Sequence, residues 1–191
     1  MICPHRIRPR AKNNRLTRAI FFDRDDTLIV DVPYNGDPEY VELMPGAREA
    51  CRLLFDLGYK LIIISNQSGV GRGMITPEQV QAVNERILEL LGKELFTAVY
   101  CCYDAPDQPN SCRKPSPHML LQAQKEHQLD LGRSFMIGDK TDDVLAGRNA
   151  GCRTVWLNPK GRPPTVPADF TASDLRQAAL WIKRMTQEEQ R

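Results

Sequence analysis

The sequence predicts an α/β fold in which a parallel β-sheet is flanked by helices. Short apolar segments of strand length alternate along the 191 residues with longer segments whose apolar residues recur at helical spacing. Such alternation is typical of parallel strands joined by right-handed helical crossovers. No internal repeat or linker divides the chain, so we expect one folded domain over residues 18–186, preceded by a disordered basic extension over residues 1–17.

Strands and helices follow one another in order along the chain. The strands are expected at residues 19–22, 59–64, 96–103, 134–137 and 153–157. The helices are expected at residues 47–57, 76–91, 117–127, 144–150 and 175–185. The second helix has the clearest start, because Thr76 can cap it, Pro77 fits its first position and Gln79 can complete a capping box. The turn-rich segment 29–43 follows the first strand and is a candidate flap over a site at that strand's end.

Composition is that of a globular protein rather than a membrane or secreted one. Apolar residues make up 41% of the chain and charged residues 26%, which is typical of globular domains. The longest aliphatic run, residues 61–64, is far too short to span a bilayer, and no apolar segment of a secretory signal follows the basic N-terminus. We therefore expect a cytoplasmic monomer that contacts no membrane.

The formal net charge of +2 hides an asymmetry. Residues 1–18 hold six Lys and Arg residues and no acid, so the rest of the chain, with 20 basic and 24 acidic residues, has a net charge of −4. A basic segment can contact nucleic acid, but the acidic body argues against a dedicated nucleic-acid surface. We prefer to interpret the segment as a solvated tail.

Cysteine usage bears on the cellular compartment. The cysteines are scattered through a chain that is long enough to fold without covalent cross-links: Cys3, Cys51, Cys101, Cys102, Cys112 and Cys152. Because no export signal accompanies them, we expect reduced thiols, as in a cytoplasm.

The most informative stretch is the first strand with the acidic residues that end it. Asp23, Asp25 and Asp26 directly follow the buried segment 19–22. Like charges against a buried strand repel one another unless a cation neutralises them. Mg²⁺ prefers carboxylate oxygen and keeps positions open for phosphate oxygens. Asp23 and Asp25 are two residues apart and so point to the same side of an extended chain. An acidic turn without a metal is the alternative for this stretch alone.

Three further strand ends carry polar groups of a complementary kind. The second strand leads into Ser65 and a Gly-rich turn, the third is followed by Lys114, and the fourth by Asp139 and Asp143. The carboxyl ends of parallel strands lie on one edge of a sheet, where ligands bind in open α/β folds. Two acidic clusters can hold Mg²⁺, while a hydroxyl and an ammonium neutralise a phosphoryl group. The set therefore suits phosphoryl transfer.

Four stretches that contain these residues resemble, in order and separation, the four motifs of the haloacid dehalogenase (HAD) superfamily of phosphatases: DRDDTL, ISNQSGVGRG, CRKP and GDKTDD. The resemblance covers residues 18–160. It is closest to the family that contains the D-glycero-D-manno-heptose 1,7-bisphosphate phosphatases and the histidinol-phosphate phosphatases. It implies a Rossmann-like, HAD-like sheet, and because no large insertion follows the first or second motif, it implies no separate cap domain.

The family's catalytic roles can be carried over to the matching positions. By resemblance, Asp23 is the nucleophile that forms an aspartyl-phosphate, and Asp25 protonates the leaving oxygen and then activates water. Ser65 hydrogen-bonds the transferring phosphoryl group, and Lys114 supplies positive charge. Mg²⁺ is held by three ligands of the family's pattern: Asp23, the backbone carbonyl of Asp25, and Asp139.

The resemblance also implies a substrate and its contacts. The expected contacts come from the loop after the first motif, from the second motif and from two cations: Asp31, Tyr34, Asn66, Gln67, Ser68, Arg113 and Lys140. Asp143 is expected to orient Lys114 or the following helix rather than to bind metal. A second phosphate would explain both cations, so the leading substrate is a sugar bisphosphate, namely heptose 1,7-bisphosphate, losing its 7-phosphate. The alternatives are histidinol phosphate or another small phosphomonoester, and a non-catalytic binding protein on the same fold.

The sequence departs from the family pattern at Asp26 and at the cysteines. Asp26 stands where the family has Gly, but other members of the superfamily carry Asp there, so activity is still expected. The family often holds a structural Zn²⁺ with Cys-x-His and Cys-x-Cys, and the matching residues here are Cys101, Tyr103, Asn110 and Cys112. Cys102 and Asp104 could complete the set, since Zn²⁺ accepts cysteine and carboxylate. Adjacent cysteines on a strand point to opposite faces, which favours a loop without zinc.

Overall fold

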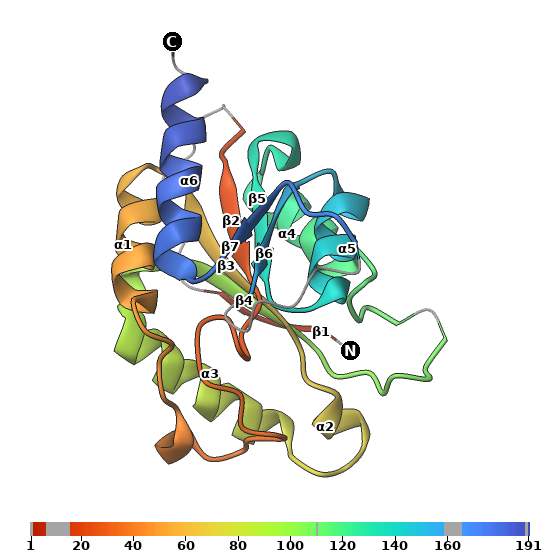
Figure 1. Cartoon of the computed structure of the whole chain (residues 1–191). Helices are drawn as coiled ribbons and strands as arrows, with labels where there is room; N and C mark the ends of the chain where they lie inside the picture. Colours follow the sequence, from red (N-terminus) through yellow and green to blue (C-terminus); the bar gives the residue numbers. More distant parts are fainter. Residues whose placement is uncertain (1, 7–15, 110, 159–165, 190) are drawn as a thin grey trace.

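The first apolar segment forms the central strand of a seven-stranded sheet, and all its residues are buried. This strand, β2 (Ala19–Phe22), pairs in parallel with β3 (Lys60–Asn66) on one side and β5 (Phe135–Gly138) on the other. The strand order is β1-β4-β3-β2-β5-β6-β7 (Figure 1). The structure is a computed structural model that describes residues 2–6, 16–109, 111–158, 166–189 and 191.

Six of the strands run parallel, which confirms the predicted α/β fold with a Rossmann-like sheet. Beyond the central three, the parallel strands are β4 (Phe96–Cys102), β6 (Arg153–Leu157) and β7 (Phe170–Ala172). The sequence analysis does not predict β7. That strand is three residues long and only Ala172 in it is buried, so it lacks the apolar run that marks the others.

Helices cover both faces of the sheet, as the alternating pattern predicts. On one face pack α1 (Ala47–Asp56), α3 (Pro77–Leu91) and α6 (Leu175–Glu188), and on the other α4 (His118–His127) and α5 (Thr141–Ala150) (Figure 1). The shorter elements are α2 (Ser68–Gly71), η1 (Pro38–Tyr40), η2 (Lys93–Leu95) and η3 (Leu131–Arg133). The capping box expected at the start of α3 is present, because Thr76 and Gln79 each accept a hydrogen bond from the other's backbone N–H.

The sheet divides the core into two apolar clusters, because successive side chains of a strand face opposite ways. In β2, Ile20 and Phe22 belong to the cluster under α1, α3 and α6, whereas Phe21 belongs to the cluster under α4 and α5. A parallel strand buried on both faces needs apolar residues at every position. This double burial explains why the central strands are visible in the sequence as unbroken apolar runs.

The N-terminal segment corrects one expectation. Residues 2–6 do not belong to a disordered extension but form β1 (Ile2–Arg6), which pairs antiparallel with β4. The pairing occupies backbone groups of β4 that would otherwise lie at an open sheet edge. Backbone pairing requires no particular side chains, so the basic composition of this segment did not reveal it. Residues 7–15, the rest of the expected basic tail, lie outside the described residues.

The connections after β2 and β3 contain only short helical elements. Between β2 and α1 lies a loop with η1, and between β3 and α3 lies the short α2. The part of the chain that the structure describes therefore contains no separate cap domain. The chain runs from β2 outward to β3 and β4 and returns to β5 on the other side of β2, which opens a crevice at this edge. None of the described helices is long and apolar enough to cross a membrane.

Candidate active site

The ends of three neighbouring strands bring the predicted catalytic residues to one place. Asp23 follows β2, Ser65 lies near the end of β3, and Asp139 follows β5. Lys114 reaches the same place from the long loop after β4, and its Nζ lies 2.6 Å from Asp23 Oδ1. The side chain of Lys114 therefore joins the loop to the central strand.

Lys114 is almost fully buried, with an exposed fraction of 2%, and contacts three acceptors. Its Nζ donates to Asp23 Oδ1 and to the carbonyl of Ile64 at 2.9 Å, and it pairs with Asp143 Oδ1 at 2.6 Å. Burial opposes the charge, but the carboxylates of Asp143 and Asp23 outweigh burial and raise the pKa of Lys114 above its ordinary value. Lys114 is therefore a fixed positive charge beside Asp23.

Asp143 is held from two sides. One oxygen pairs with Lys114, and Oδ2 accepts a hydrogen bond from the backbone N–H of Lys140 at 3.0 Å, just before α5. Gly138, the last residue of β5, lies so close to this carboxylate that any Cβ there would overlap it. Asp143 contacts Lys114 in the way that the resemblance implies, and Gly138 makes room for it.

Asp23, Asp139 and Asp143 form an acidic cluster whose ligand oxygens lie within 4.8 Å of one another. Burial, and next the charge of Asp23, raise the pKa of Asp139 to about 7. Asp139 Oδ1 is buried and has no hydrogen-bond partner among the described residues. Three carboxylates face the ammonium of Lys114 and the nearby charge of Lys140, so negative charge is still in excess. An all-oxygen donor set with an unpartnered, buried oxygen fits Mg²⁺.

Asp25 lies beside this cluster with both carboxylate oxygens hydrogen-bonded. Arg24 donates to Oδ1 from Nε at 3.0 Å and approaches it with Nη2 at 2.9 Å. Gln67 Nε2 donates to Oδ2 at 3.0 Å and lies 2.8 Å from Ser65 Oγ. Gln67 therefore links Asp25 to Ser65, so the two expected catalytic groups from β2 and β3 share one amide.

The backbone at Asp26 explains why Gly is usual at this position of the family. Asp26 has a φ of 56°, in the left-handed region that glycine adopts without strain. Aspartate is one of the few other residues that visit this region, because its short polar side chain can hydrogen-bond locally. Here Asp26 Oδ1 accepts from the backbone N–H of Asp31 at 3.4 Å. The substitution therefore keeps the turn that follows Asp25.

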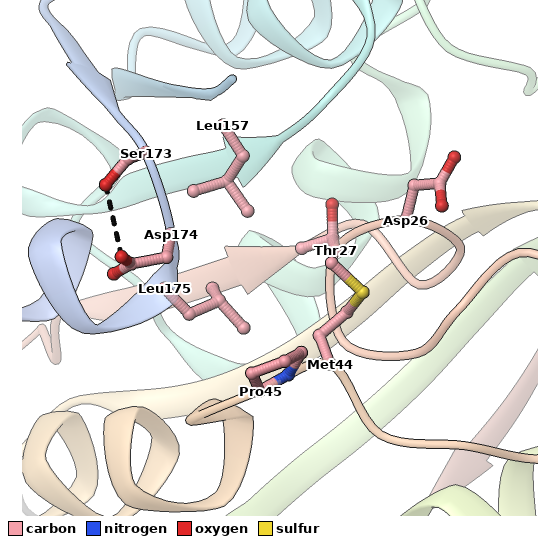
Figure 2. A pocket seen from close by; sticks show the side chains of 8 residues that line it. All are labelled: Asp26, Thr27, Met44, Pro45, Leu157, Ser173, Asp174 and Leu175. Atoms are coloured by element: carbon pink, nitrogen blue, oxygen red, sulfur yellow. Dashed lines mark hydrogen bonds between the residues drawn. The ribbon is translucent and has the colours of Figure 1, made fainter. Parts of the chain in front are cut away.

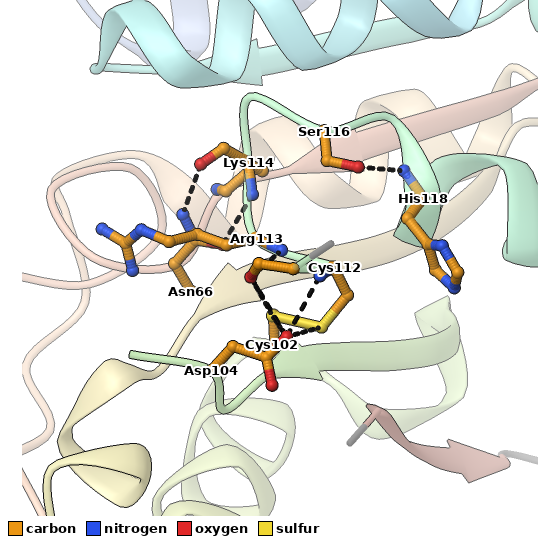
Figure 3. Close-up of a disulfide and its surroundings, with 9 residues drawn as sticks. Asn66, Cys102, Asp104, Cys112, Arg113, Lys114, Ser116 and His118 are labelled. Atoms are coloured by element: carbon orange, nitrogen blue, oxygen red, sulfur yellow. Dashed lines mark hydrogen bonds between the residues drawn. A yellow bond between two sulfur atoms is a disulfide. The ribbon is translucent and has the colours of Figure 1, made fainter. Parts of the chain in front are cut away.

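The loop that carries Arg113 and Lys114 is fixed from two directions (Figure 3). The side-chain amide of Asn66 donates to the carbonyl of Lys114 at 3.2 Å and accepts from its N–H at 3.0 Å. On the other side, a disulfide joins Cys102 at the end of β4 to Cys112. The carboxylate of Asp104 also accepts from the Cys112 N–H at 3.1 Å and from Ser111 Oγ at 3.0 Å. Figure 3 shows the side chain of Arg113 extending away from the disulfide.

A polar cavity of about 260 Å³ opens beside Asp25. Six of the expected substrate contacts line it: Asp31, Tyr34, Asn66, Gln67, Ser68 and Lys140. Burial, and next the charge of Asp25, raise the pKa of Asp31 above its ordinary value. For Lys140, burial opposes the charge but nearby carboxylates, Asp23 first, raise the pKa. The turn-rich segment after β2 thus contributes to a wall of this cavity, whereas Arg113 does not line it.

A second, mostly apolar hollow of about 140 Å³ lies between the turn after β2 and the start of α6 (Figure 2). Met44, Pro45, Leu157 and Leu175 provide its apolar lining. Asp26 is its nearest link to the first motif, and none of the expected catalytic or substrate residues lines it. We assign it no part in the site.

The cysteines correct one expectation, that of reduced thiols. Cys101, which matches a zinc ligand of the family pattern, belongs to the core cluster on the α1 side of the sheet, whereas Cys112 belongs to the cluster on the α4 side. The residue that meets Cys112 is Cys102, and the two form a disulfide rather than reduced thiols. Cys102, Asp104 and Cys112 lie together, with the two sulfur atoms joined in the disulfide. The alternation of side chains along β4 is the physical reason for this partner choice.

Two residues near the site were missed by the sequence analysis: Arg24 and Asn84. Arg24 and Asn84 are buried and hydrogen-bond each other at 3.2 Å, with Arg24 also on Asp25. Arg24 lies inside the first motif, and a cation between two catalytic acids was a signal that could have been used. Asn84 is a polar residue on the apolar face of α3, four residues from Val80 and from Leu88, which are buried on that face. Asp104 was considered only as a zinc ligand, and the structure shows that its carboxylate accepts hydrogen bonds from Ser111 and Cys112.

Comparison with known proteins agrees with this geometry. A family model described as haloacid dehalogenase-like hydrolase matches residues 34–151. A D-glycero-beta-D-manno-heptose-1,7-bisphosphate 7-phosphatase from Helicobacter pylori is 40% identical over 169 residues, which cover 87% of this chain and 97% of that protein.

Two solved structures have the same fold. A candidate HAD-like phosphatase from Mesorhizobium loti superposes with a TM-score of 0.82 at 32% identity, covering 96% of this chain and 94% of that one. The D,D-heptose 1,7-bisphosphate phosphatase of B. bronchiseptica, solved with magnesium and phosphate, gives a TM-score of 0.77 at 23% identity, covering 88% and 99%. From its motifs, its fold and these relatives, the chain belongs to the haloacid dehalogenase-like hydrolases, as a phosphatase.

Proposed function

We propose that this protein is a Mg²⁺-dependent phosphomonoesterase that acts through an aspartyl-phosphate on D-glycero-D-manno-heptose 1,7-bisphosphate and removes its 7-phosphate. One observation carries the chemistry: Asp23, the expected nucleophile, lies at the centre of an acidic cluster and is paired with the buried ammonium of Lys114. Positioning and charge are what phosphoryl transfer requires of a protein. The substrate is taken from the relatives that are named for it, and the structural neighbour that holds magnesium and phosphate supports the cofactor.

The first half of the reaction transfers the phosphoryl group to the protein. An oxygen of Asp23 attacks phosphorus, the bond from phosphorus to the sugar oxygen breaks, and Asp25 gives its proton to that oxygen. Lys114 and the Ser65 hydroxyl stabilise the negative charge on the phosphoryl oxygens. Asp23, the backbone carbonyl of Asp25 and Asp139 would hold Mg²⁺, which would supply the positive charge that lets a phosphate anion approach a carboxylate.

The second half returns the protein to its starting state. Asp25, now ionised, takes a proton from water as the water oxygen attacks phosphorus. The bond between phosphorus and Asp23 breaks, phosphate leaves, and both side chains regain their original forms. The 3.0 Å contact from Gln67 to Asp25 Oδ2 keeps this carboxylate at the wall of the polar cavity throughout.

The polar cavity and its cations support a substrate with two phosphates. Lys140 lines the cavity, and Arg113 is fixed on the loop next to Lys114. One of these cations can hold the phosphate that is not transferred, because guanidinium and ammonium groups bind phosphate oxygens well. The loop with Arg113 departs from the family pattern, being closed by the disulfide. Histidinol phosphate and other small phosphomonoesters are therefore the alternative substrates.

Phosphate release in the presence of Mg²⁺ tests the proposal. The panel is heptose 1,7-bisphosphate, fructose 1,6-bisphosphate, histidinol phosphate and p-nitrophenyl phosphate, with the Asp23→Asn variant as the blank. Asp142→Asn is the matched control, because it removes a nearby carboxylate that is outside the acidic cluster. We expect the heptose ester to be preferred, activity to be lost with chelator or with Asp23→Asn, and Asp142→Asn to stay active. Activity in Asp23→Asn would refute the mechanism, and equal weak activity on all esters would refute the substrate.

We also propose that the protein works as a monomer in the cytoplasm on this small metabolite. Sedimentation of the purified chain at micromolar concentration should give the mass of one chain, 21.7 kDa. A stable dimer would contradict this part of the proposal without affecting the chemistry.

A further inference from the structure

Arg24 is the bulkiest of the fully buried side chains described, with an exposed fraction of 1%. Burying a guanidinium costs free energy unless it is paired and hydrogen-bonded on its donors. The residue is also fixed through its backbone, because its carbonyl accepts from the N–H groups of Leu28 at 2.9 Å and Ile29 at 3.2 Å. The chemistry described above makes no use of this cation, although it lies between Asp23 and Asp25 in the sequence.

The guanidinium is held on two sides. Nε and Nη2 face Asp25 Oδ1 at 3.0 and 2.9 Å. On the opposite side, Nη1 donates to Asn84 Oδ1 at 3.2 Å, and Asn84 in turn donates to Cys101 Sγ at 3.4 Å. A guanidinium is planar and rigid, so the hydrogen bonds to Asn84 of α3, and from Asn84 to Cys101 of β4, fix its orientation. The Nε and Nη2 groups on the other side then fix the carboxylate of Asp25.

This arrangement makes the two oxygens of Asp25 unequal. Oδ1 faces two N–H groups of a side chain that has donors only, so a proton on that oxygen has no acceptor to face. Oδ2 accepts from Gln67, whose Nε2 also lies against Ser65 Oγ. Ser65 is the residue expected to contact the phosphoryl group. Oδ1 thus faces two N–H groups and Oδ2 only one, so Oδ2, on the side of Ser65, is the oxygen with a position left for a proton.

We propose that Arg24, anchored by Asn84, is a positioning residue that holds Asp25 so that Oδ2 alone exchanges the proton with the leaving oxygen and with water. This inference rests on the proposed function, because it takes Asp25 as the acid and base. The inference adds to the proposed function a buried network that lies behind the residues expected to contact the substrate. The network consists of Arg24 after β2, Asn84 in α3 and Cys101 in β4.

The dependence on the leaving group distinguishes positioning from general damage. A sugar alkoxide needs a proton as it leaves, whereas p-nitrophenolate leaves readily without one. General acid catalysis contributes about 10²- to 10⁴-fold to such steps. Because kcat/KM reports the reaction up to the first irreversible step, its ratio between the two kinds of ester reports the proton transfer to the leaving group.

The test compares kcat/KM for heptose 1,7-bisphosphate and p-nitrophenyl phosphate in the full-length protein with Mg²⁺. Arg24→Met should lower the value for the sugar ester about 100-fold and that for the aryl ester less than about 5-fold, since only the first needs the acid. For Arg24→Lys, kcat/KM for the sugar ester should be closer to that of Arg24→Met than to that of the wild type, because an ammonium lacks the two coplanar N–H groups that face Oδ1. If fructose 1,6-bisphosphate is the better alkyl substrate of the wild type, it replaces the heptose ester.

Asn84→Ala covers the case in which Arg24→Met fails to fold, because it leaves the guanidinium in place and removes only its outer anchor. This substitution should lower kcat/KM for the sugar ester about 5- to 10-fold and change kcat/KM for the aryl ester by less than about 2-fold. The pattern is the same as for Arg24→Met, but smaller. Val80→Ala is the matched control, being buried on the same face of α3. Val80→Ala should lower the free energy of unfolding and change kcat/KM for both esters by the same factor.

The outcomes separate this inference from the proposed function. Suppose that Asp23→Asn abolishes activity, but that Arg24→Met and Asn84→Ala lower kcat/KM for both esters by the same factor or change neither value. The positioning role is then wrong and the phosphatase mechanism stands. Full rescue by Arg24→Lys would also overturn it, because charge rather than geometry would then suffice. If the wild type releases no phosphate from any ester, the proposed function itself is wrong.

Discussion

The substitution Asp139→Asn should make the metal-free protein more stable while destroying its activity. Burial, and next the charge of Asp23, raise the pKa of Asp139 to about 7, against an ordinary value of 3.8. Between these two pH values the folded protein holds a proton on this carboxyl that the unfolded chain has lost. The stabilising contribution of this proton is therefore complete below about pH 4 and is lost as the pH rises through 7. Above pH 7 the ionised carboxylate is a cost to the folded state.

The size of this cost follows from the two pKa values. At about 1.4 kcal/mol for each unit of pKa, the interval from 3.8 to about 7 corresponds to at most about 4 kcal/mol. Local rearrangement of Asp23 and Asp143 reduces it. At pH 8 without metal we expect Asp139→Asn to raise the free energy of unfolding by about 1–4 kcal/mol. At pH 5 the gain should fall to less than half of that, because the wild-type carboxyl is then mostly protonated in the folded state.

The assay is urea unfolding at pH 8 and pH 5, with a chelator or with Mg²⁺. At a Mg²⁺ concentration of about 100 times the dissociation constant, the wild type should gain about 2.7 kcal/mol, whereas Asp139→Asn, lacking a ligand, should gain much less. Asp142→Asn is the control, since it removes a carboxylate from the first turn of α5 outside the cluster. It should cost about 0.3–1 kcal/mol, the opposite sign, because that carboxylate interacts favourably with the helix N-terminus.

Two results would refute this reasoning. One is an Asp139→Asn variant that is less stable than wild type at pH 8 in chelator. The other is a stability gain that stays the same between pH 8 and pH 5. Either would mean that the carboxylate of Asp139 is satisfied without a metal.

Three further predictions concern other parts of the site. Ser65→Ala should lower kcat about 10- to 100-fold with little change in stability, measured by phosphate release, because one hydrogen bond to the phosphoryl group is lost; an unchanged kcat would contradict this role. Gly138→Ala should lower the free energy of unfolding, measured by thermal unfolding, by about 1–3 kcal/mol and should lower activity, because the added Cβ would overlap Asp143. Gly132→Ala is the control, because a Cβ there has ordinary space, and it should change neither stability nor activity. Cys102→Ser, or a dithiol reductant, should lower the free energy of unfolding by about 2–3 kcal/mol, since the disulfide closes a loop of about ten residues; equal stability with and without reductant would mean that the bond does not form in solution.

Local chemistry explains why much of the site was predictable. Asp23 follows a run of buried apolar residues directly, and chain continuity alone places it at the carboxyl edge of the sheet. Asp139 directly follows β5 in the same way, and Ser65 is the next-to-last residue of β3. Parallel strands end at one edge, so these residues meet once the sheet forms. Lys114 was assigned through its motif, and its partner Asp143 through the resemblance.

Partner choice between distant segments was not predictable in the same way. The pattern of β4 indicated that Cys101 and Cys102 face opposite sides, but only the folded loop shows that Cys102 meets Cys112. Likewise β1 is held by backbone pairing to β4, and backbone groups are the same in every sequence. No periodicity of side chains records such a pairing.

The sequence by itself determined the α/β class and the positions of the central strands along the chain. It also determined which acids, hydroxyl and cation lie at the ends of these strands, because burial pattern and chain continuity are local properties. Only the tertiary structure decided that Arg24 is buried and contacts both Asp25 and Asn84. It also decided that one oxygen of Asp139 has no hydrogen-bond partner among the described residues. These features depend on contacts between side chains from different elements. Such contacts are fixed by how the layers pack against one another, and a linear pattern of apolar and polar residues does not contain that information.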